Sequence, residues 1–424
     1  MNTGSMLEKT RLDVIVVGGG AAGMMAALQA AYAGANVILL EKNEKLGKKI
    51  YITGKGRCNV TNVADTEDFF KQVPRNAKFL NAACRQFTHE DVTALLDMLG
   101  TPTKVERGGR VFPVSDKASD VTKALHHGMK DAGVQVELNC EIAHVRREGN
   151  LWAADFAQGG TLRARSVIVA TGGMSYPSTG STGDGYRFAK ENGHSVTPLK
   201  ASLAGLTIDE TWPRLLQGLS LKNVRVQAKA GKKAIYDELG EMLFTHFGVS
   251  GPLIIELSSH MPDDFGCVNV TLDMKPALDS EQIDLRLQRE FAENTRKQLS
   301  SVLMALMPAR MGPVFAQLCG MTPETPVNQI TREQRLTIGR MLKALRLRVT
   351  GTRPIEEAIV TRGGVEVKEI LPGTMMSRRQ EGLFFAGEVI DVDAHTGGFN
   401  LQIAFSTGAL AGKSAAAYAL EMEE

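Results

Sequence analysis

Three glycines near the start of the chain have the spacing that binds the diphosphate of a dinucleotide. Gly18-x-Gly20-x-x-Gly23 follows an apolar run at residues 12–17 and opens an alanine-rich helical stretch. Gly18 permits a tight strand-to-helix turn, Gly20 lets the backbone approach a diphosphate, and Gly23 lets the helix pack closely on the sheet. The diphosphate would then lie on free N–H groups at the positive end of the helix dipole.

An acidic residue completes this unit. Glu41 ends a second apolar run at residues 37–40 and is placed to accept hydrogen bonds from the adenosine ribose hydroxyls. Ala22 and Lys42 flank these positions, and we expect both to join the binding residues. Strand, glycines, helix, strand and acid in this order are much more specific than a glycine motif alone.

The composition is that of a soluble globular protein. The 424 residues are 43% hydrophobic and 23% charged, and the length predicts two or three domains. A net charge of +2 gives no global basic field for nucleic acid, although a local basic surface stays possible. No apolar run reaches the roughly 18–20 residues of a membrane span. Residues 1–11 contain no apolar signal core, so we expect a cytoplasmic protein.

The cysteines and histidines do not form a recognisable redox or metal site. None of the five cysteines forms a CxxC or CxxxxC pair, which argues against a disulfide framework and against a dithiol-using flavin reductase. No metal-ligand spacing joins the eight histidines to acids or cysteines, and we expect no metal site.

The pattern of apolar residues changes three times along the chain. Residues 1–196 are typical of an α/β domain, 197–279 alternate as an antiparallel β domain does, 280–345 have a helical period, and 346–424 return to α/β. We therefore expect an α/β fold in which a Rossmann-like nucleotide domain is discontinuous, with an inserted antiparallel β domain and a helical subdomain.

Two later glycine-rich segments favour FAD over NAD. AGEVIDVDAHTGGFNLQIAFSTGALAG resembles the final segment of flavoproteins with the two-dinucleotide-binding fold. In those proteins a strand presents an acid to the ribityl chain, and a following helix points its N-terminus at the isoalloxazine. The acid here would be Glu388, where many members of that larger group carry Asp. Backbone N–H groups around 398–401 would stabilise charge at flavin N1 and O2.

The turn that starts at Ala170 also resembles such proteins, including the fumarate-reductase group. Ala170-Thr171-Gly172-Gly173 follows a β-branched run and precedes a second glycine cluster at 180–185. No second GxGxxG follows a strand, so we expect no dedicated nicotinamide domain, and NAD(P)H would visit the flavin only transiently.

Four motifs in order resemble the BaiN/RdsA family of FAD-dependent oxidoreductases over nearly the whole chain. They are KKIYITGKGRCNVTN, LFTHFGVSGP, VTRGGV and GEVIDVDAHTGGFNLQIAFSTG. The resemblance implies one of two activities: reduction of conjugated C=C bonds in 3-oxo bile acids by NAD(P)H, or formation of dihydrouridine in large-subunit ribosomal RNA. In both, flavin N5 delivers hydride to the β-carbon, an enolate develops charge, and an acid protonates the α-carbon.

Three residues are candidates for this acid: Cys58, in a glycine-rich loop expected near the flavin, His246 in the inserted domain, and His395 beside the GGFN turn. Each also has an ordinary structural explanation, as a packed cysteine or a satisfied histidine. Arg57 would bind flavin or a substrate carbonyl, or be an exposed charge, and Asn59 and Asn400 would contact the flavin or cap turns. The residues expected to bind FAD are Gly18, Gly20, Ala22, Gly23, Glu41, Lys42, Gly56, Arg57, Asn59, Ile142, Ala170, Thr171, Gly172, Gly387, Glu388, Gly398, Phe399, Asn400 and Leu401.

The sequence leaves the substrate open between a small-molecule enone and ribosomal RNA. An RNA substrate predicts a basic patch, for which the candidates are Arg107, Arg110, Lys343, Arg346 and Arg348, and a steroid-like substrate predicts an apolar pocket. Two other functions are open: a flavin-dependent amine or aminoketone oxidase, and a non-catalytic FAD-binding redox protein.

Overall fold

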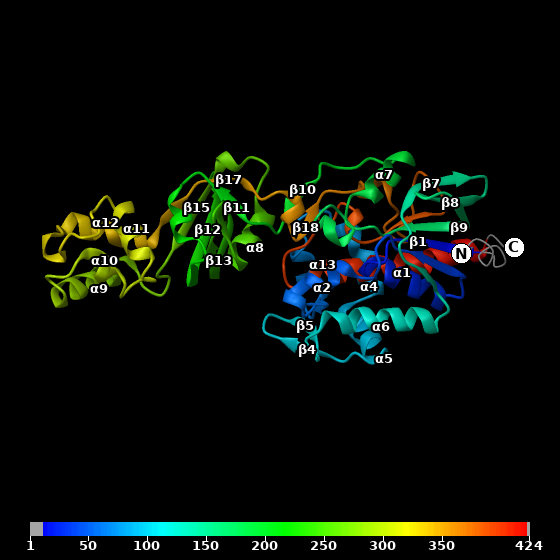
Figure 1. Ribbon diagram of the computed structural model, residues 1–424, viewed down its shortest axis with the longest axis horizontal. Coiled ribbons are helices and arrows are strands. Elements are labelled where there is room, and N and C mark those ends of the chain that lie inside the picture. Colours follow the sequence, from blue (N-terminus) through cyan, green and yellow to red (C-terminus); the bar gives the residue numbers. More distant parts are fainter. Residues whose placement is uncertain (1–11, 422–424) are drawn as a thin grey trace. The chain divides into compact units, whose positions relative to one another are not determined.

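The computed structural model describes residues 12–421, which form two compact units (Figure 1). The first unit contains the chain up to Ser202 and from Ile355 onward, and the second contains Leu203–Pro354. Each unit has its own hydrophobic core. The segment 1–11, in which we expect no signal peptide, lies outside the described residues.

A parallel sheet forms the centre of the first unit. Its strands run in the order β6-β2-β1-β9-β8-β7, with β19 beside the end of β9. Strands β6, β2, β1, β9 and β19 are parallel, whereas β8 and β7 form an antiparallel extension. The bounds are β1 Leu12–Val17, β2 Val37–Leu40, β6 Gln135–Glu137, β7 Ile142–Glu148, β8 Leu151–Phe156, β9 Thr161–Val169 and β19 Leu383–Phe385.

Two helices of the first unit pack against each other unusually closely. A Cβ on Gly408 or Gly412 of α13 (Phe399–Glu421) would lie 2.4 Å or 2.2 Å from a backbone carbonyl oxygen of α1 (Ala21–Tyr32). The other elements of this unit are α2 Lys48–Ile52, β3 Thr61–Asn62, α3 Thr66–Lys71, α4 Asn81–Gln86, α5 His89–Met98, β4 Thr103–Glu106, β5 Arg110–Pro113, α6 Ala118–Asp131, α7 Asp184–Glu191, β10 Lys200–Ser202 and β18 Val360–Arg362.

The second unit combines an antiparallel sheet with helices over one shared core. The strand order is β16-β15-β12-β13-β14-β11-β17, and side chains from the sheet and the helices belong to the same buried cluster. The bounds are β11 Leu206–Ile208, β12 Ser220–Ala230, β13 Lys233–Phe244, β14 Gly248–Ser250, α8 Pro252–His260, β15 Val268–Asp273, α9 Ser280–Glu293, α10 Leu299–Leu303, α11 Met311–Leu318, α12 Arg332–Lys343, β16 Leu345–Leu347 and β17 Val349–Thr352.

These two units confirm the expected fold class, a Rossmann-type parallel sheet with a separate antiparallel sheet. One strand differs from its sequence pattern. Alternation predicts a strand from Leu203, but β11 begins at Leu206 because Leu203 has a φ of 58°, a left-handed conformation that leaves the ladder. Across residues 12–421, no helix combines the length and the apolar character that a membrane span requires.

Candidate cofactor site and active site

The glycine turn between β1 and α1 contains two tightly packed glycines and one glycine with open space beside it. A Cβ on Gly18 would meet the Ala170 carbonyl oxygen at 2.5 Å, and a Cβ on Gly23 would meet the Gly18 carbonyl oxygen at 1.8 Å. A Cβ on Gly20 would meet no atom within 4 Å. Gly20 is also the N-cap of α1, which has neither a capping side chain nor an acidic residue in its first turn. The first N–H groups of α1 therefore have no capping side chain, and the positive end of the helix dipole has no acidic residue beside it in the first turn.

Glu41 lies beside this turn, at the carboxyl end of β2. Its Oε2 accepts a hydrogen bond from the Gly19 N–H at 2.7 Å, and its Oε1 accepts two from Asn43. The Cys140 N–H donates to the Glu41 carbonyl oxygen, which brings the start of β7 at Ile142 near this end of the sheet. Lys42 instead turns to α7, where it pairs with Asp184 at 2.6 Å.

Farther along the same edge, Glu388 is held by three protein donors. Lys49 Nζ donates to its Oε2 at 2.7 Å, and the Ser175 hydroxyl and the Thr361 N–H donate to its Oε1 at 2.9 Å and 2.8 Å. Burial acts to raise the pKa of Glu388, but the charge and hydrogen bond of Lys49, with the bonds from Thr361 and Ser175, hold that pKa below its ordinary value. Sequence reasoning missed Lys49, Ser175 and Thr361, since no local spacing connects them to Glu388.

The loop that carries Cys58 has several left-handed residues. Lys55 and Cys58 have φ of 59° and 60°, with Gly54 and Gly56 at 55° and 87°. A left-handed non-glycine residue costs on the order of 1 kcal/mol and is held only by its surroundings. Cys58 is completely buried, and this burial raises the pKa of its thiol to about 12, so the thiol keeps its proton at neutral pH.

Asn59 follows Cys58, and its side-chain oxygen Oδ1 is buried and has no hydrogen-bond partner. This oxygen lies beside Gly398, whose Cβ would be 3.0 Å from it and 2.4 Å from the Thr61 carbonyl oxygen. Gly397 and Gly398, with φ of 121° and 103°, directly precede Phe399 and Leu401 in the first turn of α13. The Thr171 hydroxyl, in the turn after β9, is another buried oxygen without a partner.

The side chains of Arg57 and Asn400 both bind other parts of the protein. The Arg57 guanidinium donates to both Glu106 and Asp116 and stacks over the Phe112 ring at 4.2 Å, so it fastens the Cys58 loop to β4 and β5. The Asn400 side chain accepts from the Ala394 N–H and donates to the carbonyl oxygen of the same residue, which caps the turn before α13.

The three candidate acids do not all belong to one unit. His395 is buried in the first unit, in a segment that packs on the loop of Cys58, where the Asn62 amide donates to the Gly397 carbonyl oxygen at 3.0 Å. His246 belongs to the second unit, where it is exposed between β13 and β14 and contacts the Phe247 ring edge-on.

The basic residues considered for RNA are likewise divided between the units. Arg107 and Arg110 lie at the turn between β4 and β5 in the first unit, whereas the other three belong to the second. Lys343 pairs with Asp273 at 2.6 Å and Arg348 pairs with Asp209 at 2.8 Å. These two cations are therefore already partly neutralised by protein carboxylates.

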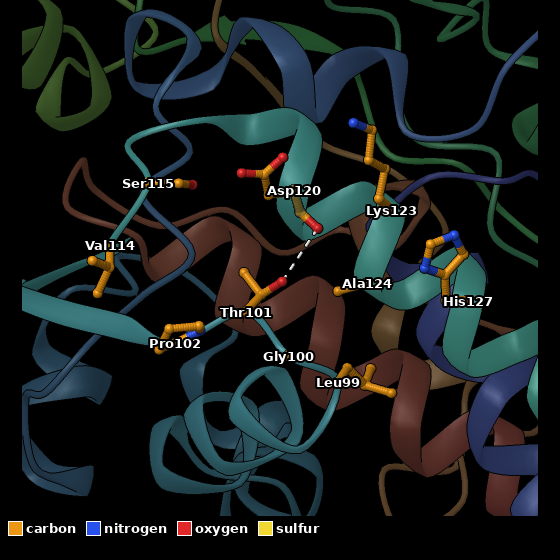
Figure 2. Close-up of a pocket in the computed structure, with 10 residues that line it drawn as sticks. All are labelled: Leu99, Gly100, Thr101, Pro102, Val114, Ser115, Asp120, Lys123, Ala124 and His127. Carbon is orange, nitrogen blue, oxygen red and sulfur yellow. Dashed lines mark hydrogen bonds between the residues drawn. The ribbon is translucent and has the colours of Figure 1, made fainter.

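A separate pocket of about 440 Å³ lies beside α6 (Figure 2). Thr101 and Val114 line one side, and Asp120, Lys123 and His127 of α6 line another. Figure 2 shows the Thr101 hydroxyl bonded to the Asp120 carbonyl oxygen, 3.5 Å away. No residue expected to bind FAD or to transfer a proton lines this pocket.

Comparison with known proteins gives similarities over almost the entire chain. The family model described as HI0933-like protein Rossmann domain matches residues 12–414. The 3-dehydro-bile acid delta(4,6)-reductase of Clostridium scindens is 31% identical over 409 residues, which are 95% of this chain and 98% of the relative. The ribosomal RNA dihydrouridine synthase of Escherichia coli is 31% identical over 398 residues, 94% of this chain and 96% of the relative.

Two solved structures share the fold at lower identity. The 3-ketosteroid-delta4-(5alpha)-dehydrogenase of Rhodococcus jostii has a TM-score of 0.51 and 15% identity and covers 98% of both chains. An open flavocytochrome c3 fumarate reductase has a TM-score of 0.50 and 19% identity and covers 97% of this chain and 79% of its own. At these identities the likeness concerns the fold alone.

Proposed function

We propose that this chain is an FAD-dependent enzyme that reduces a C=C bond conjugated to a carbonyl group. The chain belongs to the HI0933-like Rossmann-domain family of oxidoreductases, which supports this proposal. NAD(P)H is the proposed electron donor, and the cytoplasm is the proposed location. The observation that carries the proposal is the open N-terminus of α1 beside Glu41, at the carboxyl edge of the parallel sheet.

The residues at this edge fit an extended FAD. Glu41, with Ile142 nearby, would hold the adenosine end, and Gly18, Gly20, Ala22 and Gly23 would hold the diphosphate. Ala170, Thr171, Gly172, Gly387 and Glu388 would contact the ribityl chain. Gly398 to Leu401 would present the N-terminus of α13 to the isoalloxazine, where the unpartnered Asn59 oxygen offers an acceptor. Lys42, Gly56, Arg57 and Asn400 would support these segments.

Bound FAD supplies the hydride in this chemistry. The protein must then place the acceptor against the flavin, donate hydrogen bonds to the developing enolate oxygen, and provide a proton. Cys58 is the proposed proton donor, because its buried thiol keeps its proton at neutral pH and lies in the loop that packs on Gly398. His395 and His246 are the alternative donors.

Two relatives that match almost the whole chain support the proposed substrate class. One is named for a bile-acid C=C reduction and the other for a uracil C=C reduction in RNA, and both acceptors are conjugated carbonyl compounds. The shared chemistry is the proposal for this chain. The division of the basic residues between two units and the ion pairs of Lys343 and Arg348 give RNA no specific support over a small enone.

The test begins with the purified protein. We expect a bound flavin spectrum, bleaching by NAD(P)H without air, and reoxidation by a 3-oxo-4-ene steroid or a related enone. A deletion strain tests the other acceptor, because a dihydrouridine missing from its ribosomal RNA and restored by the wild-type gene identifies RNA as the substrate. A Cys58→Ala variant should bind and reduce flavin normally but lose most product formation. Flavin that no donor reduces, or that only amines reduce, contradicts the proposal.

A further inference from the structure

Two adjacent lysines in α2 have nearly equal exposure but very different partners. The side chains of Lys48 and Lys49 are 22% and 23% exposed. Lys48 pairs with Glu44, whose side chain is 62% exposed, whereas Lys49 pairs with Glu388, whose side chain is 19% exposed. An exposed pair contributes little, whereas a carboxylate out of water depends strongly on its cation. The two lysines therefore differ in what their removal would do.

The pair of Lys49 and Glu388 lies at the edge where the cofactor is proposed to bind. The Gly47 N–H donates to the Gly19 carbonyl oxygen at 2.9 Å, so α2 begins beside the glycine turn. A Cβ on Gly387 would lie 2.7 Å from the Cβ of Ala22, so Glu388 follows directly on a contact with the first turn of α1. The pair thus adjoins the open N-terminus of α1.

The hydrogen bonds at this pair leave one acceptor and one donor unused. Glu388 Oε1 accepts from Ser175 and from the Thr361 N–H, whereas Oε2 accepts from Lys49 alone. Two of the three N–H bonds of Lys49 point to Glu388 and to the Ser175 hydroxyl, which is 2.5 Å away. A carboxylate has about four acceptor sites and an ammonium has three donors. A hydroxyl group can accept from the remaining N–H of Lys49 or donate to Oε2 of Glu388, so this pair could bind a chain that carries hydroxyl groups.

We propose that Lys49 is a positioning residue for the cofactor: its ammonium holds the Glu388 carboxylate beside the N-terminus of α1, where Oε2 would accept from a hydroxyl of bound FAD. This inference rests on the proposed FAD site. Without Lys49 the carboxylate would lack its counter-ion, so burial would raise its pKa, and once protonated it would offer fewer acceptor sites.

Other groups near Glu388 do not replace this cation. The Tyr186 hydroxyl of α7 lies 3.5 Å from the Glu388 carbonyl oxygen, and burial raises the pKa of that phenol. Asp391, on the same segment, is an acid whose pKa burial also raises. Arg75 pairs with Asp393 at 2.5 Å. Among residues 12–421, Lys49 is the cation in contact with this carboxylate.

The experiment measures the dissociation constant of FAD from the apoprotein between pH 6 and pH 9, by quenching of flavin fluorescence. The wild type should bind FAD with little dependence on pH. Lys49→Met should weaken binding about tenfold at pH 9, from loss of a hydrogen bond to a charged group, and further as pH falls. Lys48→Met is the matched control: it removes the pair with Glu44 and a hydrogen bond to Asn43, neither of which touches Glu388, so its FAD affinity should show no pH trend. Glu388→Gln should bind weakly at every pH, because it cannot titrate.

Two outcomes separate the inference from the proposed function. A wild type that binds no FAD overturns the proposed function. A wild type that binds FAD while Lys49→Met matches Lys48→Met at every pH overturns only the role of Lys49. If Lys49→Met loses its cooperative melting transition, Ser175→Ala and Lys49→Arg take its place. The FAD affinity of Ser175→Ala should fall as the pH falls, but less steeply than that of Lys49→Met, and the FAD affinity of Lys49→Arg should not depend on pH. If Lys49 had a purely structural role, either variant would change the melting temperature without any pH dependence of FAD affinity.

Discussion

At the scale of single residues, the three glycines of the first turn have different physical tasks. Gly18 and Gly23 are required by packing, because a side chain at either position would collide with backbone atoms. Gly20 has an extended conformation, with φ −79° and ψ −172°, and open space where a Cβ would lie. The folded chain alone therefore does not require glycine at position 20, whereas the proposed diphosphate would.

Substitution of these glycines separates stability from binding. Gly20→Ala should change the free energy of unfolding by less than about 0.5 kcal/mol, as at other unconstrained sites, and should weaken FAD binding at least about tenfold. Gly23→Ala should destabilise the protein by roughly 1–3 kcal/mol, because the helix must move off the turn. Urea unfolding and FAD titration measure the two effects. Normal FAD affinity in Gly20→Ala would show that no diphosphate lies at α1.

At the scale of elements, a buried histidine fastens the connection after α7 to the segment before β19. His194 Nε2 lies 2.8 Å from the Ser377 hydroxyl oxygen, and its Nδ1 lies 3.4 Å from Glu369. Burial lowers the pKa of His194. The hydrogen bond from Arg379, with those from Ser195, lowers the pKa of Glu369 to about 2 against the smaller opposing effect of burial. The native state thus favours a neutral histidine and an ionised carboxylate.

This network predicts that the protein loses stability in two acidic ranges. As the pH falls below 6.5, the unfolded state binds a proton at His194 before the native state does. The free energy of unfolding therefore decreases as the pH decreases. From pH 4.5 toward 2, protonation of Glu369 removes a further contribution on the order of 1–3 kcal/mol. His194→Gln should flatten the first range in urea unfolding at pH 7.5, 6 and 5. His144→Gln, at an exposed pair with Glu191, is the control and should leave the slope unchanged.

For the whole molecule, the chain enters and leaves the second unit at neighbouring positions of the first unit. The second unit is inserted between Ser202 and Ile355, and β10 pairs with β18 so that Ser202 lies opposite Val360. Both ends of the insertion therefore leave from one short antiparallel ladder. The proposed FAD residues belong to the first unit, and the candidate acid His246 belongs to the second.

A deletion tests this division. Replacement of residues 203–354 by a short Gly-Ser linker should leave a folded protein that binds FAD, because a flexible loop of that length costs little to close. Circular dichroism and flavin absorbance measure folding and binding. Glu388→Gln in the same background should weaken the flavin binding, as in the full chain. A folded deletion variant without flavin would mean that the second unit contributes to the FAD site.

Features that depend only on neighbouring residues could be predicted from the sequence. The glycine turn, Glu41 and the change from α/β to alternating and back to α/β are read within short windows, because strand and helix periods and glycine turns are local properties. The inserted antiparallel sheet and the return to α/β were predicted in this way, and the returning segment ends in the helix Phe399–Glu421. The start of β11 was not predicted, because the left-handed backbone conformation of Leu203 depends on its tertiary surroundings.

Contacts between side chains that are far apart in the sequence could not be predicted, because they depend on the three-dimensional fold. Lys49, Ser175 and Glu388 are separated by 126 and 213 residues along the chain, and they converge because β9 and β19 are parallel neighbours that end at the same edge as the glycine turn. The same holds for Arg57, whose contacts with Glu106 of β4 and Phe112 of β5 were not predicted, and for the burial of Cys58. Hydrogen bonds and desolvation act over a few ångströms of space, and sequence separation contains no information about that distance.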